Sequence, residues 1–546
     1  GKREAFIDPL SVKNNLEYGD DRTNVGSLTL TNTEYTSWEG KLAISYNESI
    51  NSHNINVGGG LEVKTTRRRT NTGTYKGFQS AEFSSPEFAR SMPYKPNFQE
   101  VQTRLFGMFA RLNYSYQDIY LLDASLRIDG SSEFGSDKRY APFFSGGLGL
   151  NIHKYAFMEK YGFVNHLKVR GSFGQTGKVN FAPYAAVPTH EIDIDEWYIS
   201  GPASSLMTTR GNRDLKWEKT NKFDVGFELG LLRNLLYLEF SWYNEITNGL
   251  ITDVTLPSST GFRTYKSNMG KVENKGFEIQ FRSDLLSTVD WYVAVFANLA
   301  HNTNKIKKIS DALKAYNDAV NEYYNQEIES LWDKDNPNLN RVMTKYEEGQ
   351  SLSAKYGLKS LGIDPANGQE LYVYRDGTVS YDWIATEMRN IGDEMPWGTG
   401  SFGVNLRWKN ITFSTSFLYE FGGDFYNETL IDKVENAKIE EYNVDRRAMS
   451  QRWKKFGDVV MYKDIKDNRQ TTDPTSRFMQ RNNVLSWNSM TIGYELDREM
   501  LKRIGIENIR IEVGTNDLWR LSTVKAERGL SYPYANSVNF SVNVRF

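Results

Sequence analysis

Three glycines, Gly398, Gly400 and Gly403, have the GxGxxG spacing of a dinucleotide-binding loop. In such a site the glycines let the backbone approach a pyrophosphate, and the loop must follow a strand and open a helix. The residues from Phe402 to Trp408 alternate between apolar and polar, which is the period of a strand and not of a helix. The spacing therefore predicts the entry to a strand, and we expect no dinucleotide site here.

Two other segments contain fragments of ligand-binding motifs. Gly174–Lys178 resembles part of a phosphate-binding loop, but its spacing is wrong and Val179 stands where Ser or Thr would bind Mg²⁺. Asp364, Asn367 and Gly368 suggest a calcium loop, yet the regular schedule of oxygen ligands is missing. Short polar side chains beside a glycine favour an Asx-type turn instead.

The chain lacks the side chains on which many enzyme active sites depend. It has no cysteine, which removes thiolate metal sites, disulfides and cysteine nucleophiles together, and its 5 histidines are scattered. The sequence contains neither a metalloprotease helix nor a GxSxG elbow. We therefore predict no catalytic residue, no cofactor and no metal site, and we expect that the protein is not an enzyme.

The composition narrows the class of protein further. Over 546 residues, 66 basic side chains balance 68 acidic ones, which argues against a surface that binds nucleic acid. The apolar fraction is only 39%, yet 14% of the residues are aromatic, which argues against disorder. No apolar run is long enough for a transmembrane helix. A large soluble all-β protein and a β-barrel that turns half of its strand residues to lipid both remain.

A period of two between apolar and polar residues recurs along the chain. From Leu105 to Tyr116 the even positions are apolar or aromatic, whereas Arg111 and Asn113 lie between them. Tyr120–Ile128 repeats this pattern, which is that of a strand with one apolar and one polar face. We count about 15 such strands, of which Trp38–Tyr46 is the first.

The connections between these strands alternate between short and long. Short connections are predicted near Asn47–Ser52, Gln117–Asp118, Arg233–Asn234, Leu285–Asp290 and Lys409–Asn410. Long connections are predicted at Lys64–Arg104, Gln175–Thr220, Glu245–Asn274, Asn302–Pro396 and Phe421–Asn483. Because this alternation places the long loops at one end of an up-and-down barrel, it favours a transmembrane barrel over a Greek-key sandwich. Aromatic residues flank the turns, as in an interfacial girdle or in ordinary cross-strand packing: Tyr116, Tyr120, Trp242, Tyr243 and Trp408.

Nine segments, in one order along the chain, carry a resemblance to a known family. They are LRIDGSSEFG at Leu126–Gly135, RYAPFFSGGLG at Arg139–Gly149, LKVRGSFGQTG at Leu167–Gly177, LKWEKT at Leu215–Thr220, YNEITNGLI at Tyr243–Ile251, NMGKVENKGFEI at Asn268–Ile279, NTNKI at Asn302–Ile306, GIDPANG at Gly362–Gly368 and SYPYANS at Ser531–Ser537. The set resembles the SusC/RagA-type TonB-dependent transporters of Bacteroidota outer membranes. One segment alone is weak, but the ordered set spans nearly the whole chain.

The resemblance implies an all-β fold, a transmembrane antiparallel β-barrel of about 22 strands with a plug domain inside it. The chain shows neither a plug, a TonB box nor a signal peptide, so we expect it to be the C-terminal part of a longer protein. We interpret residues 1–37 as an extracellular loop and residues 38–546 as the barrel portion. Its long loops would then be extracellular, and its C-terminus would lie on the periplasmic side.

The same resemblance implies active, TonB-dependent import of an oligomeric nutrient across the outer membrane of a Gram-negative bacterium of the Bacteroidota. A glycan is the first candidate for the cargo, and a peptide is the alternative. The implied partners are a SusD-like surface lipoprotein, TonB–ExbB–ExbD and outer-membrane lipid, with a dimer of SusCD heterodimers as the assembly. Taken without the resemblance, the residues also allow a passive porin or structural barrel, or a soluble all-β adhesin.

One long loop contains a helical pattern. Apolar residues recur at helical spacing at Ile309, Leu313, Tyr316, Val320, Tyr324, Ile328 and Leu331. We predict a helical insertion at residues 306–332, which either packs on its own loop or docks a partner at the outer surface.

The candidate site residues fall into two groups. Aromatic and planar polar side chains in the long loops are candidates for binding the cargo, because such groups hold both sugars and peptides: Trp197, Tyr198, Trp332, Tyr372, Asp382 and Trp383. Four arginines on the polar faces of strands are interpreted as facing the lumen, where they would hold the plug through its carboxylates: Arg111, Arg127, Arg170 and Arg510.

Overall fold

The computed structural model describes most of the chain. The described residues are 1–11, 25–135, 138–179, 181–198, 201–209, 211–233, 235–255, 264–268, 270–309, 314–315, 317–318, 345–437, 439, 443–466, 472–496, 501, 505–525 and 536–545. For residues 159, 191–198, 201–209, 252–255 and 264–265 only the backbone is described.

One antiparallel sheet of sixteen strands dominates the described structure, and its strands lie side by side in chain order. They are β1 (Lys2–Ile7), β2 (Ser27–Ile50), β3 (His53–Lys76), β4 (Asn97–Tyr116), β5 (Tyr120–Ser131), β6 (Tyr140–Asn151), β7 (Val164–Lys178), β10 (Glu218–Leu231), β11 (Leu236–Asn248), β14 (Lys271–Ser287), β15 (Trp291–Lys308), β21 (Gly398–Trp408), β22 (Ile411–Tyr426), β23 (Met479–Glu495), β24 (Asn508–Ser522) and β25 (Ser537–Arg545). The predicted all-β, up-and-down barrel topology is confirmed, with one strand more than the approximate count.

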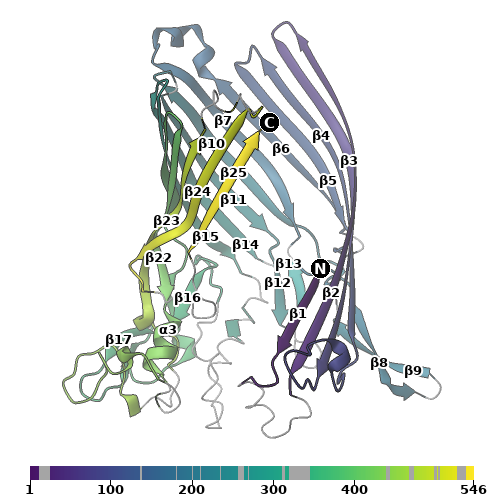
Figure 1. Cartoon of the computed structure of the whole chain (residues 1–546), viewed down its shortest axis with the longest axis vertical. Coiled ribbons are helices and arrows are strands. Elements are labelled where there is room, and N and C mark those ends of the chain that lie inside the picture. The colour runs from purple at the N-terminus through teal and green to yellow at the C-terminus, as the bar shows by residue number, and fades with distance from the viewer. Residues whose placement is uncertain are drawn as a thin grey trace.

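The sheet curls into most of a barrel wall (Figure 1). Its two edges are β1, in purple, and β25, in yellow, which lie on either side of an opening. Among the described residues, β1 pairs with β2 alone and β25 with β24 alone. Between these edges the antiparallel register runs from strand to strand, so backbone groups within the wall are paired, as a membrane-spanning wall requires.

Strands such as β5 present an apolar and a polar face, as the alternation predicts. On β5, Leu122 and Leu126 are 37% and 49% exposed on one face. On the other face, Arg127 donates a hydrogen bond from Nε to Asp129 Oδ1 at 2.5 Å. We call these two surfaces of the sheet the apolar face and the polar face. A broad apolar surface that no other described element covers suits contact with hydrocarbon better than contact with water.

The short and long connections lie at opposite ends of the sheet, as predicted (Figure 1). At the short-turn end, Gln117 and Asp118 have φ of 54° and 52°, and Leu232 and Arg233 have φ of 53° and 58°. Two successive positive φ values are typical of type I′ turns, whose twist matches that of the strands they join.

The long connections carry small elements of their own. Their strands are β8 (Thr189–Tyr198), β9 (Gly201–Thr209), β12 (Ile251–Thr255), β13 (Thr264–Asn268), β16 (Ala354–Gly357), β17 (Lys359–Ile363), β18 (Glu370–Val373), β19 (Val379–Ser380) and β20 (Arg389–Asp393). The short helical segments of the described chain include η1 (Pro86–Phe88), η2 (Ile152–Lys154), η3 (Ala156–Lys160), η6 (Ala385–Glu387), α3 (Glu428–Leu430), η7 (Ile431–Glu435), η8 (Arg446–Ala448) and η10 (Ser476–Phe478). Of these, η2 and η3 lie at the short-turn end. No helix of the described part is long and apolar enough to cross a membrane.

The first strands begin earlier than the sequence pattern indicates. β2 starts at Ser27 instead of Trp38 and β1 precedes it, so residues 1–37 contain strand segments as well as loop. Threonines replace the apolar alternation here, with the Oγ1 atoms of Thr31 and Thr72 at 3.3 Å across the pair. β-Branched threonine favours strands even where no apolar face is formed. The extracellular position of these residues stays a prediction.

The predicted insertion at residues 306–332 begins later than expected, because β15 continues to Lys308. Within the rest of that range the structure describes residue 309 and the helical pairs 314–315 and 317–318. The Asn317 side chain donates to the Tyr346 carbonyl at 2.7 Å and accepts from its amide at 2.9 Å. The remainder of the predicted helix lies outside the described residues.

Candidate functional site

The polar face of β7, β10 and β11 is built from ion pairs between neighbouring strands. Arg170 of β7 donates from Nη1 to Asp224 Oδ1 at 2.9 Å and from Nη2 to Glu239 Oε1 at 3.0 Å. The same Nη2 atom lies 2.6 Å from Ser241 Oγ. One guanidinium therefore joins acidic groups of two other strands, which its forked geometry allows. Charges at this density are compatible with a wet interior and incompatible with the lipid side of a wall.

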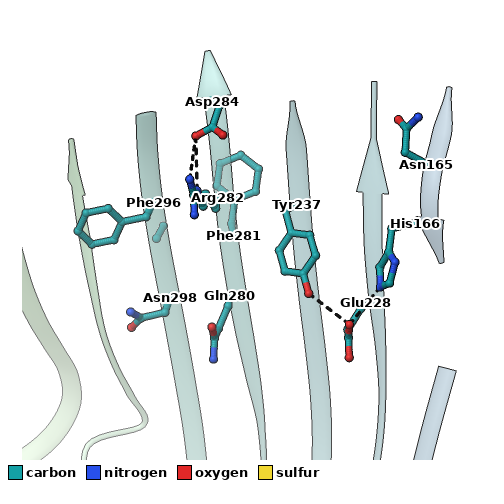
Figure 2. Close-up of a pocket in the computed structure, with 11 residues that line it drawn as sticks. Asn165, His166, Glu228, Tyr237, Gln280, Phe281, Arg282, Asp284, Phe296 and Asn298 are labelled. Atoms are coloured by element: carbon teal, nitrogen blue, oxygen red, sulfur yellow. Dashed lines mark hydrogen bonds and ion pairs between the residues drawn. The ribbon is translucent and has the colours of Figure 1, made fainter. Parts of the chain in front are cut away.

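A cavity of about 760 Å³ opens on this face towards the short-turn end. Figure 2 shows Glu228 at one side, between His166 and Tyr237, and Arg282 and Asp284 at the other. His166 Nε2 lies 3.1 Å from Glu228 Oε2, and the Tyr237 hydroxyl donates to the same oxygen at 3.4 Å. Tyr237 lies between the two sides. The cavity therefore combines hydrogen-bonding groups of both charges on a rigid sheet.

The other predicted lumen arginines also lie on the polar face, and two of them pair within the wall. Arg127 Nη2 lies 3.4 Å from Glu62 Oε2 of β3, and Arg510 Nη2 lies 2.6 Å from Glu512 Oε1 of its own strand. Arg111 covers a glycine of the neighbouring strand, since a Cβ on Gly58 would lie 2.9 Å from its Nε. The wall itself supplies carboxylates for Arg127, Arg170 and Arg510, and contact of the four arginines with a plug stays a prediction.

The described parts of two long connections, residues 345–397 and 427–478, interlock into one unit that we call the loop lobe. The Leu358 amide donates to the Pro474 carbonyl at 3.1 Å, and the Ser476 amide donates to the Leu358 carbonyl at 2.9 Å. The Trp453 indole donates to the Pro365 carbonyl at 3.0 Å. These contacts cross from one connection to the other, so neither half of the lobe is independent of the other.

A buried ion cluster ties the two halves together. Arg477 Nη2 donates to Glu370 Oε2 and Glu435 Oε1, both at 2.7 Å, and the exposed fractions of the three side chains are 5%, 6% and 0%. Burial opposes the charge of Glu435, yet the Arg477 charge and hydrogen bonds hold the pKa of this carboxyl below its usual value. Thr475 Oγ1 donates to Glu370 at 2.6 Å and Thr472 Oγ1 donates to Glu435 at 2.6 Å.

The loop lobe also contains a carboxyl that titrates near neutrality. Burial raises the pKa of Asp473 to about 7, and the charge of Glu370 adds to this while Lys463 opposes it. Burial, followed by the charge of Glu370, raises the pKa of Tyr372 well above its usual value. The lobe therefore holds the Tyr372 phenol neutral over the physiological pH range.

The structure places three of the predicted cargo-binding residues, Tyr372, Asp382 and Trp383, together in the loop lobe. Tyr372 is 8% exposed inside a hydrophobic cluster with Trp383 packed against it, which favours a structural role for both rings. The Trp383 indole donates to the Pro474 carbonyl at 3.0 Å, and Asp382, nearby and exposed, accepts the Tyr374 hydroxyl at its carbonyl at 2.8 Å.

The other aromatic candidates are less well placed by the structure. Trp197 and Tyr198 lie on β8, in a hairpin at the long-loop end, and their side chains lie outside the described part (Figure 1). Trp332 lies outside the described residues altogether. Binding of cargo by any of the six candidates stays a prediction.

One exposed aromatic residue of the lobe was missed by the sequence reasoning. Tyr381 is 45% exposed, and its hydroxyl donates to Asp364 Oδ2 at 2.5 Å. An exposed aromatic ring beside a carboxylate is the kind of surface that we expect to bind cargo. Nothing in the local sequence pairs these two residues, because only the folding of the β17–β18–β19 sheet brings them together.

The motif fragments have the structural roles that the sequence predicts. The Asp364 side chain accepts from the Ala366 amide at 2.8 Å and Gly368 has φ of 78°, so this segment is an Asx-type turn. Gly398–Trp408 is strand β21, so the GxGxxG glycines open a strand. Within the described ranges no three acidic or histidine side chains converge as a metal site.

Comparisons with known proteins agree on the fold. Residues 3–414 match the family model described as TonB dependent receptor-like, beta-barrel. TonB-dependent receptor P3 of Formosa agariphila is 24% identical over 94% of this chain and 52% of its own length. TonB-dependent receptor SusC of Bacteroides thetaiotaomicron is 27% identical over 60% of this chain and 32% of its own length. The solved structure of the RagAB peptide transporter superposes with a TM-score of 0.76 at 21% identity, covering 92% of this chain and 53% of that one. The chain thus spans about half the length of the first relatives that it matches.

Proposed function

The chain belongs to the TonB-dependent receptor-like β-barrel family, and from this premise we propose that it forms much of the wall of an outer-membrane importer driven by TonB. The family match over residues 3–414 is the observation that carries the proposal. The apolar face is then the lipid side and the polar face lines the lumen. The short-turn end and the C-terminus of β25 would lie in the periplasm, and the loop lobe would lie outside the cell.

The role of the wall follows from its two faces. A curved antiparallel sheet satisfies its backbone groups within itself, which a hydrocarbon environment demands. Its polar face offers the Arg170 ion pairs and the cavity beside Glu228 to whatever occupies the lumen. In the proposed importer this occupant is a plug, whose displacement by TonB opens the path for cargo.

We propose an oligomeric glycan as the cargo, a peptide being the alternative. The name of the structural neighbour RagAB refers to a peptide transporter, whereas exposed aromatic rings such as Tyr381 suit sugar rings as well. A SusD-like lipoprotein is the proposed lid over the loop lobe, within a dimer of SusCD heterodimers. The interlocked lobe supports this assignment because a preorganised surface loses little entropy on docking.

Uptake by cells that express the full-length protein tests the import proposal. Labelled oligosaccharides and labelled peptides are offered to cells with and without functional TonB. We expect concentration of an oligosaccharide only in cells that have both this protein and TonB. Uptake that persists without TonB would instead indicate a passive pore, and uptake of peptides alone would replace the glycan assignment.

A pair of variants tests the contribution of the exposed loop ring. Tyr381→Phe keeps the ring and removes the hydroxyl that donates to Asp364, whereas Tyr381→Ala removes both. If the ring stacks on the cargo, the alanine variant raises the half-saturating concentration for uptake and the phenylalanine variant changes it little. Equal effects of the two variants would argue against stacking.

A further inference from the structure

The connection between β6 and β7, residues 152–163, carries exposed aromatic rings at the short-turn end. It contains the short helical segments η2 and η3. Phe157, Tyr161 and Phe163 are 55%, 52% and 54% exposed. Exposed rings gathered on one short segment need a partner surface, because leaving them in water forfeits the free energy of burying them.

The rings of this connection are continuous with those of the apolar face. The Tyr155 hydroxyl donates to the Tyr120 hydroxyl at 2.9 Å, and the two ring centroids are 6.4 Å apart. Tyr155 stacks on Phe157 at 5.6 Å, and Tyr120 stacks on Tyr116 at 6.2 Å. Tyr116 and Tyr120 share the apolar face with Leu122, two residues along β5. We call Tyr116, Tyr120, Tyr155 and Phe157 the aromatic belt.

The start of the same connection contacts the opposite face of the sheet. The His153 ring lies 4.7 Å from the ring of His166, which belongs to the polar face and borders the cavity of Figure 2. The chain therefore crosses the rim of the wall between His153 and Tyr155. Beyond that crossing, it turns its rings to the side on which the leucines of β5 are exposed.

Other strands mark the same level of the apolar face with aromatic residues. Trp291 at the start of β15 stacks on Trp408 at the end of β21, with centroids 5.7 Å apart. Tyr494, near the end of β23, is 49% exposed. Amphipathic rings concentrate where hydrocarbon meets headgroups, so these residues mark the boundary of the lipid-facing band.

We propose that the 152–163 connection docks into the headgroup region of the phospholipid leaflet at the short-turn end, with the aromatic belt inserted and Lys154 and Lys160 at the level of the phosphates. Continuity with the lipid-facing surface selects lipid as the partner. Lys154 Nζ lies 3.1 Å from Asp118 Oδ2 at the neighbouring turn. This inference rests on the outer-membrane placement proposed above.

Spin labels on single cysteines test the docking, because the chain has no cysteine of its own. Phe157→Cys carries the probe, Leu126→Cys is the lipid reference, and Glu507→Cys is the water reference on another connection of the same end. The full-length protein, with any cysteine outside this chain replaced by serine, is reconstituted in phospholipid bilayers. Collision with oxygen and with a water-soluble nickel chelate then gives the depth of each label.

The expected depth of the label at position 157 is about 5–10 Å into the boundary between headgroups and acyl chains. The label at Leu126 should lie deeper, and the one at Glu507 should be as accessible to nickel as a label in water. Nickel accessibility at 157 equal to that at 507 would overturn the docking proposal, as would shielding from both reagents, which indicates a protein contact. An aqueous label at Leu126 would instead refute the membrane placement itself.

Discussion

An arginine placed on either face of β5 tests the assignment of the two faces directly. Leu126 belongs to the apolar face and is 49% exposed there. Its neighbour Ser125 belongs to the polar face, where its hydroxyl lies 2.7 Å from that of Ser145. We expect Leu126→Arg to destabilise the barrel by about 2–4 kcal/mol and Ser125→Arg by less than about 1 kcal/mol.

The magnitude follows from the position of Leu126 along its strand. Tyr120, in the aromatic belt, begins β5, and Leu126 follows it six residues later. With a rise of about 3.3 Å per residue and a tilt of about 40°, Leu126 stands about 15 Å above the belt. The hydrocarbon layer is about 25–30 Å thick, so Leu126 is near its midplane. Leu122 stands only about 5 Å above the belt, so Leu122→Arg should have the smaller penalty of the interface, about 0–1 kcal/mol.

Denaturant unfolding of the full-length protein in lipid vesicles, followed by tryptophan fluorescence, measures these differences. We expect Leu126→Arg to be the most destabilised variant, with Leu122→Arg and Ser125→Arg both within about 1 kcal/mol of wild type. Equal penalties at Leu126 and Ser125 would mean that the faces are misassigned. Equal penalties at Leu126 and Leu122 would refute the depth that we derive from the aromatic belt.

Three further predictions concern the loop lobe and the packing of the wall. Arg477→Leu leaves two buried carboxylates without their cation. It should lower the free energy of opening of the lobe, measured by hydrogen exchange, by about 3–5 kcal/mol. Arg375→Leu, which removes a more exposed ion pair, should change this free energy little. Similar exchange in both variants would contradict the role of the buried cluster. Because the pKa of Asp473 is raised to about 7, its neutral form is favoured in the folded lobe, so its stabilising contribution is full below about pH 4 and is lost as the pH rises through 7. Asp473→Asn should therefore reduce the loss of lobe stability, measured by hydrogen exchange, between pH 5 and 8. An unchanged pH profile would show that Asp473 is not the source of the pH dependence. Gly226→Ala places a Cβ 2.6 Å from a backbone oxygen of β11 and should lower the free energy of unfolding by about 1–3 kcal/mol. A Cβ at Gly162 meets no atom within 4 Å, so Gly162→Ala should change this free energy by no more than about 0.5 kcal/mol. If Gly226→Ala leaves the stability unchanged, β10 and β11 can separate enough at this position to accommodate the added methyl group.

The ion pairs of the wall illustrate what could be foreseen only in part. The side-chain alternation places Arg127 and Arg170 on the polar face, because successive residues of a strand point to opposite sides. Their partners Glu62 and Glu239 come from other strands, and the sequence contains no signal for the register that brings them within reach. The carboxylates that the structure places beside these arginines belong to the wall, and contact of the arginines with a plug stays a prediction.

The chain by itself determined the features that depend on local periodicity. Alternating residues define the two faces, and short spacings between strands place the hairpin turns at one end. Tertiary structure decided the features that depend on distant contacts. Threonine pairing extends β2 and β3 beyond the apolar band, and packing between two connections buries Tyr372 while leaving Tyr381 exposed. The physical reason is that a strand's facing is set by its own backbone geometry, whereas burial in a loop is set by whichever segment folds against it.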